Sequence, residues 1–290
     1  MTASRLSSLL SRVALGLGAL SLALATASPA VALTFTTIDF PGSTGTQDGI
    51  AINVHGQIVG DYIDTGGIRH GFLLDNGTFR TIDFPGATNT SAFMINNQGQ
   101  ITGSYDVSGV GHGFLLENGT FSTIDVPGAT HTVAIFINEP GQIAGYHVSG
   151  GKTLGFLLDG GTFTTIDVPG ARFTIAEAVN DAGQIVGFYG IASLPPHGFL
   201  LDKGTFTTVD IPGAQFTNGF GISNRGQMVG TYGDASQQMV HGFLLDRGSF
   251  TAIDVPGATA TSVFVINARG QMSGVYTDTG GIRHGFLAEP

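Results

Sequence analysis

Apolar and polar residues alternate over short runs along most of the chain, and Gly, Asn and Pro separate the runs. A period of two residues is typical of β-strands with one buried face, not of helices. Between positions 91 and 125 the pattern predicts four strands, at residues 91–96, 100–106, 112–117 and 120–125. We therefore expect an all-β protein.

Turn residues separate these predicted strands. Asn118-Gly119 forms a two-residue hairpin between the third and fourth strands, because Gly tolerates a positive φ. Asn96 opens a tight turn between the first and second strands. Pro127 follows the fourth strand and cannot donate to a strand ladder, so a longer loop begins there. Because strand direction alternates, the tight turns lie at one end of the unit and the longer loops at the other.

The four-strand unit recurs from one end of the chain to the other. An Asp in an I-D-x-P-G signature, once V-D-I-P-G, marks each copy, and successive copies lie 42 to 44 residues apart. The marker residues are Asp39, Asp83, Asp125, Asp167, Asp210 and Asp254. A fixed period of this size indicates a repeat architecture, in which each unit buries its apolar face against its neighbours.

The two ends of the repeat region predict how it closes. Residues 33–39 match a lone fourth strand, whereas residues 261–288 match the first three strands without a fourth. If these segments pair, the chain forms a six-bladed β-propeller of four-stranded antiparallel blades, closed by the N-terminal strand and the C-terminal three strands. An open β-solenoid is the alternative, but it would leave the terminal strands unpaired and would need capping units.

Phenylalanine recurs at two positions of the unit, which together account for twelve of the 21 Phe residues. One set follows the Gly of the third strand: Phe72, Phe114, Phe156, Phe199, Phe243 and Phe286. The other opens the fourth strand: Phe35, Phe79, Phe121, Phe163, Phe206 and Phe250. If buried, each ring contributes roughly 1.5 to 3 kcal/mol, so we expect both sets to hold neighbouring blades together.

The first 32 residues differ from the rest. Arg5 and Arg12 precede an apolar run at 13–25, and small residues lead up to Ala32. This pattern predicts a secretory signal peptide at residues 1–32, cleaved after Ala32. Residues 33–290 then form a single repeat domain of 258 residues, which is six times 43. We expect an exported protein, extracellular or periplasmic, without disulfides because the chain has no Cys.

Charge limits the classes of partner. The net charge is −10, or −12 once the two basic residues of the leader are removed, and no Lys or Arg cluster is present. An acidic surface of this kind argues against nucleic acid and anionic membranes. Beyond the leader, no apolar stretch is long enough to insert into a membrane. We expect a monomer whose partners, if any, are a glycan or an extracellular protein.

Five histidines precede the Gly-Phe of the third strand, which raises the question of a metal site. Hairpin register places each one opposite a marker Asp instead, so we predict structural pairs that hold the hairpins in register and no metal site. The pairs are His70 with Asp83, His112 with Asp125, His197 with Asp210, His241 with Asp254 and His284 with Asp39. In the remaining unit Leu154 faces Asp167 without such a partner.

Other candidate chemistry has a structural explanation. A Tyr repeats on the second strand, at Tyr62, Tyr105, Tyr146, Tyr189, Tyr232 and Tyr276, and we interpret these residues as packing positions. No nucleophile, phosphate-loop or zinc motif is present, so we expect no cofactor and favour a protein that is not an enzyme. Calcium binding by acidic loops, such as residues 61–64, remains an alternative.

The unit I-N-x-x-G-Q-I-x-G-x-Y, H-G-F-L-L-x-x-G-x-F and T-I-D-x-P-G-A resembles the bacterial extracellular repeats grouped as the HAF family. The similarity covers residues 33–286, with His-Gly-Phe mostly in place of the family's His-Ala-Phe. The resemblance implies an exported repeat protein of undetermined activity. It therefore carries no functional residue over to this chain.

Departures from the repeat point to a site at the loop end of the third to fifth units. We predict ligand-binding residues at Lys152, Arg172, Phe173, Gln215 and Phe216. The leading hypothesis is a secreted, non-enzymatic propeller that binds a neutral glycan or a protein partner through this face. One alternative is a carbohydrate-active enzyme that uses Asp48 and Glu177 at the channel mouth. The other is a purely structural component of an envelope or matrix.

Overall fold

A computed structural model describes residues 33–46, 50–235 and 239–290. The predicted signal peptide at 1–32 and Asp48 lie outside this part. The described residues form 24 strands and no helix, so no helix among them is long and apolar enough to span a membrane. The all-β prediction is confirmed.

Residues 33–290 form one compact unit of repeated antiparallel sheets. Its first part contains β1 (Thr34–Ile38), β2 (Ala51–Ile52), β3 (Ile58–Ile63), β4 (Arg69–Asp75), β5 (Thr78–Ile82), β6 (Asn89–Ile95), β7 (Ile101–Val107), β8 (Val110–Glu117) and β9 (Thr120–Ile124). Next come β10 (His131–Ile137), β11 (Ile143–Ser149), β12 (Lys152–Asp159), β13 (Thr162–Ile166), β14 (Phe173–Val179), β15 (Ile185–Gly190), β16 (His197–Asp202) and β17 (Thr205–Val209). The last strands are β18 (Phe216–Ile222), β19 (Met228–Gly233), β20 (Val240–Asp246), β21 (Ser249–Ile253), β22 (Ala260–Ile266), β23 (Met272–Thr277) and β24 (Arg283–Glu289).

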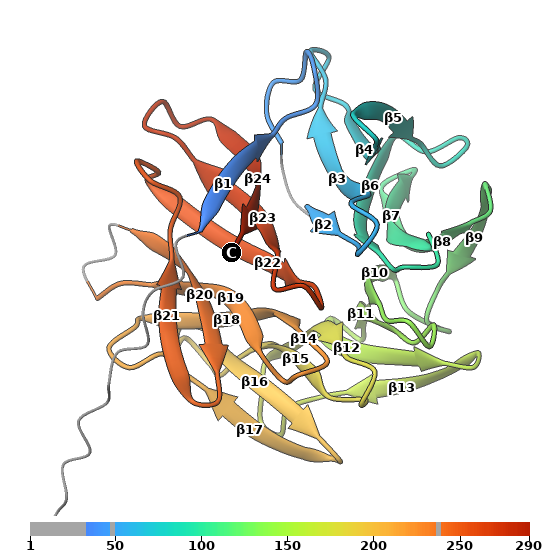
Figure 1. Ribbon diagram of the computed structural model, residues 1–290. Coiled ribbons are helices and arrows are strands. Elements are labelled where there is room, and N and C mark those ends of the chain that lie inside the picture. The colour runs from blue at the N-terminus through green and yellow to red at the C-terminus, as the bar shows by residue number, and fades with distance from the viewer. Residues whose placement is uncertain (1–32, 47–49, 236–238) are drawn as a thin grey trace, which may run out of the picture. The chain divides into compact units, whose positions relative to one another are not determined.

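Four separate four-stranded sheets form from β2–β5, β6–β9, β10–β13 and β14–β17. The remaining strands form an eight-stranded sheet, in which β20 and β22 are joined by a single parallel pair, Val240 with Ala260. Within the unit these sheets surround a common centre, and the first strand of each set lies nearest to it (Figure 1). This arrangement is a β-propeller.

The first strand of the repeat region pairs with the last. β1 is antiparallel to β24, with Thr34 opposite Glu289 and Ile38 opposite Gly285. The Phe35 ring also contacts the Phe286 ring edge to face, with 5.7 Å between centroids. The pairing predicted from the chain ends is thus observed, and residues separated by most of the chain share one sheet.

A bulge in the innermost strands explains a glycine of the repeat. The pairing of β6 with β7 shifts between Ala92 and Met94, and β10, β14, β18 and β22 shift at the same place. A Cβ on Gly103 of β7 would overlap the carbonyl oxygen of Ser91 and the ring of Phe114. The Gly two residues before the repeated Tyr is therefore required by the close approach of the two strands.

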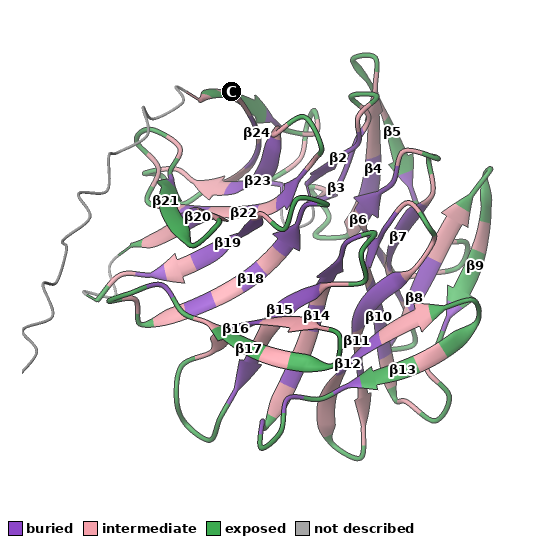
Figure 2. Ribbon diagram, turned by 60° about the horizontal axis from the view of Figure 1, so that its bottom comes forward, coloured by how far each residue is buried: buried purple, intermediate pink, exposed green. Residues whose placement is uncertain are grey.

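The two predicted sets of Phe rings differ in burial. The six rings after the third-strand Gly are 0 to 1% exposed, as predicted. The rings that open the fourth strand are only partly buried, and Phe250 is 37% exposed, because this strand lies at the outer edge of its sheet (Figure 2). The second set therefore contributes less than the first, because its rings keep more of their surface exposed.

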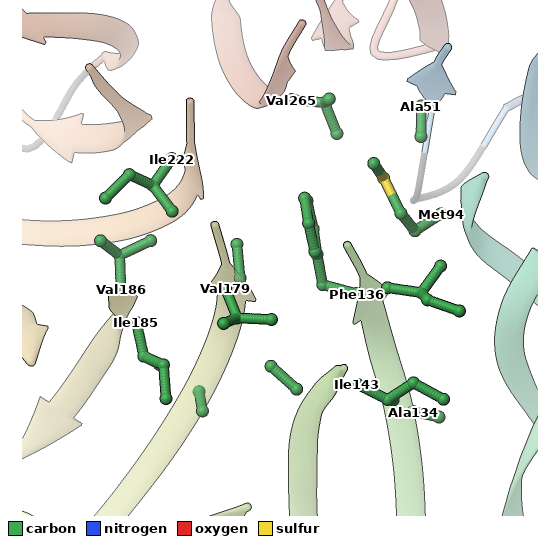
Figure 3. Close-up of a cluster of buried hydrophobic side chains, with 14 of the residues drawn as sticks. Ala51, Met94, Ala134, Phe136, Ile143, Val179, Ile185, Val186, Ile222 and Val265 are labelled. Atoms are coloured by element: carbon green, nitrogen blue, oxygen red, sulfur yellow. The ribbon is translucent and has the colours of Figure 1, made fainter. Parts of the chain in front are cut away.

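The core extends to the centre of the unit. Met94, Phe136, Val179, Ile222 and Val265, each from a different inner strand, surround one space (Figure 3). Burying apolar surface stabilises a protein by roughly 25 cal/mol per Å². The apolar side chains at the centre therefore hold the sheets to one another as well as stabilising each of them. The same inner strands form the walls of the candidate site.

Candidate binding site

The structure shows all five predicted His–Asp pairs in contact. Each imidazole lies on the third strand of its sheet and faces a carboxylate just beyond the fourth strand, at the loop end. The Nδ1 to carboxylate distances are 2.9 Å for His70 and Asp83, 2.9 Å for His112 and Asp125, 3.0 Å for His197 and Asp210, 2.9 Å for His241 and Asp254, and 2.8 Å for His284 and Asp39. These contacts join neighbouring strands in register, as a structural role requires.

In the sheet without such a histidine, a lysine forms the ion pair with the Asp. Lys152 Nζ lies 2.6 Å from Asp167 Oδ2, although Lys152 is two residues earlier in the chain than Leu154. A long flexible stem spans the added distance. This sheet lacks the histidine, as predicted, but its Asp pairs with a lysine that the sequence analysis did not consider as its partner. Lys152, predicted to bind a ligand, thus has a structural contact that explains its presence.

His70 and His284 differ from the other paired histidines because each faces two carboxylates. His70 Nε2 lies 3.4 Å from Asp64, and His284 Nε2 lies 3.4 Å from Asp278. Partial burial acts to lower the pKa of His70, but hydrogen bonds and charge from Asp83 and Asp64 outweigh it and raise the pKa above 6.5. Below this raised pKa both ring nitrogens carry a proton, and each can donate to one of the two carboxylates.

This arrangement predicts a pH-dependent contribution to stability. The pKa of His70 in the folded protein is above its ordinary value of 6.5. The contribution of its ion pairs to the free energy of unfolding is therefore complete below pH 6.5 and is lost as pH rises through the raised pKa. We expect His70→Gln to lower the free energy of unfolding more at pH 6 than at pH 9, measured by urea denaturation. Asp64→Asn should reduce this difference without abolishing it. An equal loss for His70→Gln at both pH values would contradict the assignment.

Tyr146 departs from the repeat, which the sequence interpretation missed. Tyr105 faces His112 across the strand pair, and the other repeated Tyr residues take the same register. In β11 it is His147 that occupies this register position, opposite Leu154, while Tyr146 lies one residue earlier and so faces the opposite side of the sheet. His147 is buried, which lowers its pKa, and its Nδ1 atom has no hydrogen-bond partner.

Tyr146 contributes to a cavity of about 270 Å³ near the centre of the unit. Four of the other lining residues occupy equivalent positions at the strand bulge, and a fifth bulge residue, Glu177, is the only acid in the lining. The complete lining is Phe93, Val133, Ile135, Phe136, Tyr146, Glu177, Phe220, Phe264 and Val265. We call this space the central cavity. Of the two acids predicted at the channel mouth, Glu177 is thus placed in a cavity and Asp48 lies outside the described residues.

A polar groove of about 480 Å³ adjoins the central cavity and shares Phe93, Val133 and Tyr146 with it. Its polar residues come from β4, β6, β7 and β10: Arg69, Asn89, Ser91, Ser104, Asp106 and His131. We call it the β6–β10 groove. Apolar and aromatic walls with a few convergent polar groups are typical of small-molecule sites.

The polar side chains of the groove are held in place. The Asn89 side-chain carbonyl accepts a 3.1 Å hydrogen bond from the Arg69 amide, and the Arg69 guanidinium lies 2.9 Å from buried Asp61. The His131 ring packs on Gly111, where a Cβ would overlap it, and lies 6.2 Å from the Tyr146 ring with a 22° angle between planes. Two nearly parallel rings therefore line the groove.

The predicted residues Phe173 and Phe216 are equivalent to the groove residues. Phe173 is the first residue of β14 and Phe216 the first of β18, just as Asn89 begins β6 and His131 begins β10. Each Phe ring packs on a glycine of its own sheet, where a Cβ would overlap it. They therefore lie at the same end of the unit as the groove but line neither it nor the central cavity.

A chain of aromatic contacts leads from the predicted sector to the central cavity. Phe173 contacts Phe188 at 6.1 Å, Phe188 contacts Phe220 at 6.1 Å, and Phe220 contacts Phe264 at 5.1 Å. The Arg172 guanidinium lies 5.7 Å from the Phe173 ring centroid. The backbone N–H of Gln215 donates to the backbone carbonyl of Gly233, at 2.9 Å. Ligand binding by this sector stays a prediction.

At the opposite end of the centre, asparagine side chains link neighbouring sheets. Asn96 Nδ2 donates to the carbonyl oxygen of Asn138 in the next sheet at 3.2 Å, and Asn138 donates to that of Asn180 at 3.2 Å. The space at this end is only about 100 Å³. We therefore look to the loop end, where the wider spaces lie, for ligand entry.

The acidic loop proposed for calcium uses its oxygens internally. Asp64 accepts hydrogen bonds from the amides of Gly66 at 2.8 Å and Ile68 at 2.9 Å. Asp61 is paired with Arg69, as described above. Within residues 33–46, 50–235 and 239–290, no group of three or more His, Asp or Glu side chains is placed to hold a metal ion.

Comparison with known proteins bears on the fold. Neither a family model nor a curated protein matches the sequence. A putative TolB from Agrobacterium tumefaciens superposes with a TM-score of 0.58 at 12% identity, over 84% of this chain and 90% of its own. A mutant Aleuria aurantia lectin in complex with Fucα1-6GlcNAc gives 0.54 at 12% identity, over 84% and 93%. Catalytically inactive virginiamycin B lyase from Staphylococcus aureus with quinupristin gives 0.52 at 11% identity, over 88% of each chain. Such low identities relate these proteins by fold alone.

Proposed function

We propose that this chain is an exported, non-enzymatic HAF-type repeat protein whose six-bladed propeller binds a neutral glycan in the β6–β10 groove. The observation that carries the proposal is the groove itself, in which amide, hydroxyl and imidazole groups converge beside two nearly parallel rings. Sugar hydroxyls need such donors and acceptors, and the apolar face of a pyranose packs on aromatic rings.

The weak joint in the eight-stranded sheet supports the blade count of the proposal. A single pair of residues links β20 to β22, so this sheet divides into β18–β21 and β22–β24 with β1. The four other sheets then bring the number of blades to six. A sixfold repeat places six loop ends around one face, of which the two that contribute Asn89 and His131 border the groove.

The fold comparisons support binding without naming a ligand. The Aleuria aurantia lectin shares the fold of this chain and is bound to Fucα1-6GlcNAc in its structure. For this chain we infer a neutral sugar because the protein carries a net charge of −10, which disfavours acidic polysaccharides. Arg172, Phe173, Gln215 and Phe216 extend the proposed face at equivalent positions of the next blades.

We expect the purified protein to bind at least one class of neutral glycan on an array. We further expect His131→Ala and Asn89→Ala each to weaken that binding about tenfold, since each removes a polar contact worth roughly 1.4 kcal/mol. Isothermal titration calorimetry with the glycan found on the array measures the change.

Thr207→Ala provides the control, because Thr207 is exposed on the outer strand β17. The glycan affinity of this variant should equal that of the unchanged protein. Phe216→Ala tests whether the ligand extends to the predicted sector. An array without a neutral glycan signal overturns the proposal. Glycan turnover that disappears in Glu177→Gln would establish the enzymatic alternative in its place.

A further inference from the structure

The central cavity adjoins the β6–β10 groove, so a ligand of the groove can extend into it. Phe93, Val133 and Tyr146 line both spaces. The groove is rich in polar side chains, whereas seven of the nine residues that line the cavity are Phe, Ile or Val. A ligand that fills both spaces therefore has a polar part and an apolar part.

The cavity is large enough for a substituent of several carbons. Its volume is about 270 Å³, and an apolar cavity of roughly 150 Å³ in another protein holds a benzene molecule. Phe93, Ile135, Phe220 and Phe264, the bulge residues of four inner strands, are only half-buried, so their side chains leave this space unfilled. Covering such apolar surface with a hydrocarbon group is favourable, because the surface is removed from water.

Tyr146 provides a hydrogen-bond donor beside both spaces. Within the described part of the chain its hydroxyl makes no hydrogen bond, because its register turns it to the other side of the sheet. Burial, together with the negative charges of Glu177 in the cavity and Asp106 in the groove, raises the pKa of Tyr146, so the hydroxyl keeps its proton. Four of the other repeated tyrosines instead share a hydrogen bond with a threonine hydroxyl: Tyr62 with Thr81, Tyr105 with Thr123, Tyr189 with Thr208 and Tyr276 with Thr37.

The groove supplies partners for the hydroxyl groups of a sugar. The Asp106 carboxylate accepts a 3.5 Å hydrogen bond from the Asn89 side chain, and a carboxylate has about four lone-pair positions. Ser91 lies opposite Ser104 in the strand pair, so two hydroxyls lie side by side in the groove. Sugar hydroxyls both donate and accept, which matches this set of groups. The polar part of the ligand is then the sugar ring, and the apolar part is a substituent on it.

We infer that the ligand is an N-acylated amino sugar, with its ring in the β6–β10 groove, its acyl chain in the central cavity and its carbonyl oxygen accepting a hydrogen bond from Tyr146. The inference rests on the proposed function, whose ligand class it narrows. Such a sugar is uncharged, whereas a free fatty acid would bring a carboxylate toward Asp106 and Glu177. An amide carbonyl is also a stronger hydrogen-bond acceptor than an ester carbonyl, which favours an N-acyl over an O-acyl sugar.

A series of glucosamine derivatives tests the inference on the full chain, because its members differ only in the acyl group. Isothermal titration calorimetry compares N-acetyl-, N-butanoyl- and N-hexanoylglucosamine with glucose, and a series on galactosamine covers the epimer. Each methylene buried in the cavity should tighten binding about fourfold, equivalent to ~0.8 kcal/mol. The N-butanoyl sugar should therefore bind roughly fifteenfold more tightly than the N-acetyl sugar, and glucose should bind most weakly.

Two variants separate the acyl chain from its carbonyl. Ile135→Phe reduces the space, and the fold accepts it because Phe occupies the same bulge position in β6, β18 and β22. It should bring the fifteenfold ratio close to one. Tyr146→Phe should weaken binding of each N-acyl sugar about fivefold, the effect of one neutral hydrogen bond. Tyr189→Phe is its control, because Tyr189 lines neither space and its affinities should not change.

The outcomes separate this inference from the proposed function. Equal affinities across the series, array binding confined to sugars without an acyl group, or an Ile135→Phe variant that keeps the dependence on chain length would overturn the inference alone. No binding of any sugar, on the array or by calorimetry, would overturn the proposed function and the inference with it. Thermal unfolding verifies that each variant is folded, and the series on the unchanged protein decides the inference where a variant is not.

Discussion

Phe156→Ala should lower the free energy of unfolding by about 3–5 kcal/mol, the range for a fully buried ring. Phe156 is 1% exposed and contacts the Phe163 ring edge to face, with 5.5 Å between centroids. Loss of the ring removes its burial and leaves a cavity that the surrounding strands cannot fill. Urea denaturation followed by circular dichroism measures the loss.

Phe250→Ala is the comparison for this experiment, since Phe250 belongs to the second set of repeated rings and is 37% exposed. Its outer position leaves less apolar surface to lose, so we expect a cost below about 1.5 kcal/mol. Similar losses for the two variants would show that burial at the third-strand position does not govern stability in this propeller.

Much of the fold could be predicted because the repeat presents the same local pattern several times. Alternation identified the strands, and Asn-Gly pairs identified the hairpins, where Asn118 indeed has a φ of 50° and Gly119 one of 77°. Hairpin register then placed His112 opposite Asp125, although the side chains themselves are thirteen residues apart. These features depend on short-range geometry, which one unit is enough to specify.

Features that depend on a shift of one residue were not predictable in the same way. Tyr146 was assigned to the repeated Tyr position by residue type, yet its register places it on the other side of the sheet. The bulge that places Glu177 in the central cavity interrupts the period of two without a sequence signal of its own. Lys152 reaches Asp167 because of stem length, which spacing alone does not show.

The candidate site combines these departures. Tyr146 and Glu177 both break the repeat, in neighbouring sheets, and both line the central cavity. Neither residue continues the pattern of its strand, and both lie where the described inner strands leave a space of about 270 Å³. The useful signal in the sequence was therefore the spacing of Tyr146, which follows Gln142 of its unit by four residues, whereas Tyr105 follows Gln100 by five.

The pairing of β1 with β24 joins the two ends of the repeat region, so loss of β1 should affect the whole unit. Ile38, which is 9% exposed, lies opposite Gly285, and the adjacent Phe286 is fully buried. Without β1, the amide and carbonyl groups along one edge of β24 lose their partners and the Phe286 ring loses its cover. An exposed apolar edge strand is a template for pairing with another chain.

We expect a chain that begins at residue 42 to unfold at lower urea concentration than one that begins at residue 33, and to associate in a concentration-dependent manner during gel filtration. A synthetic peptide of residues 33–41 supplies β1 and the Asp39 partner of His284, so it should restore the monomer and much of the stability. A peptide with Thr36→Pro is the matched control, because proline removes a backbone donor and disfavours the strand. If the shortened chain remains monomeric and equally stable, or if the control peptide rescues it as well, then the terminal strand is an appendage and the sheets hold together without it.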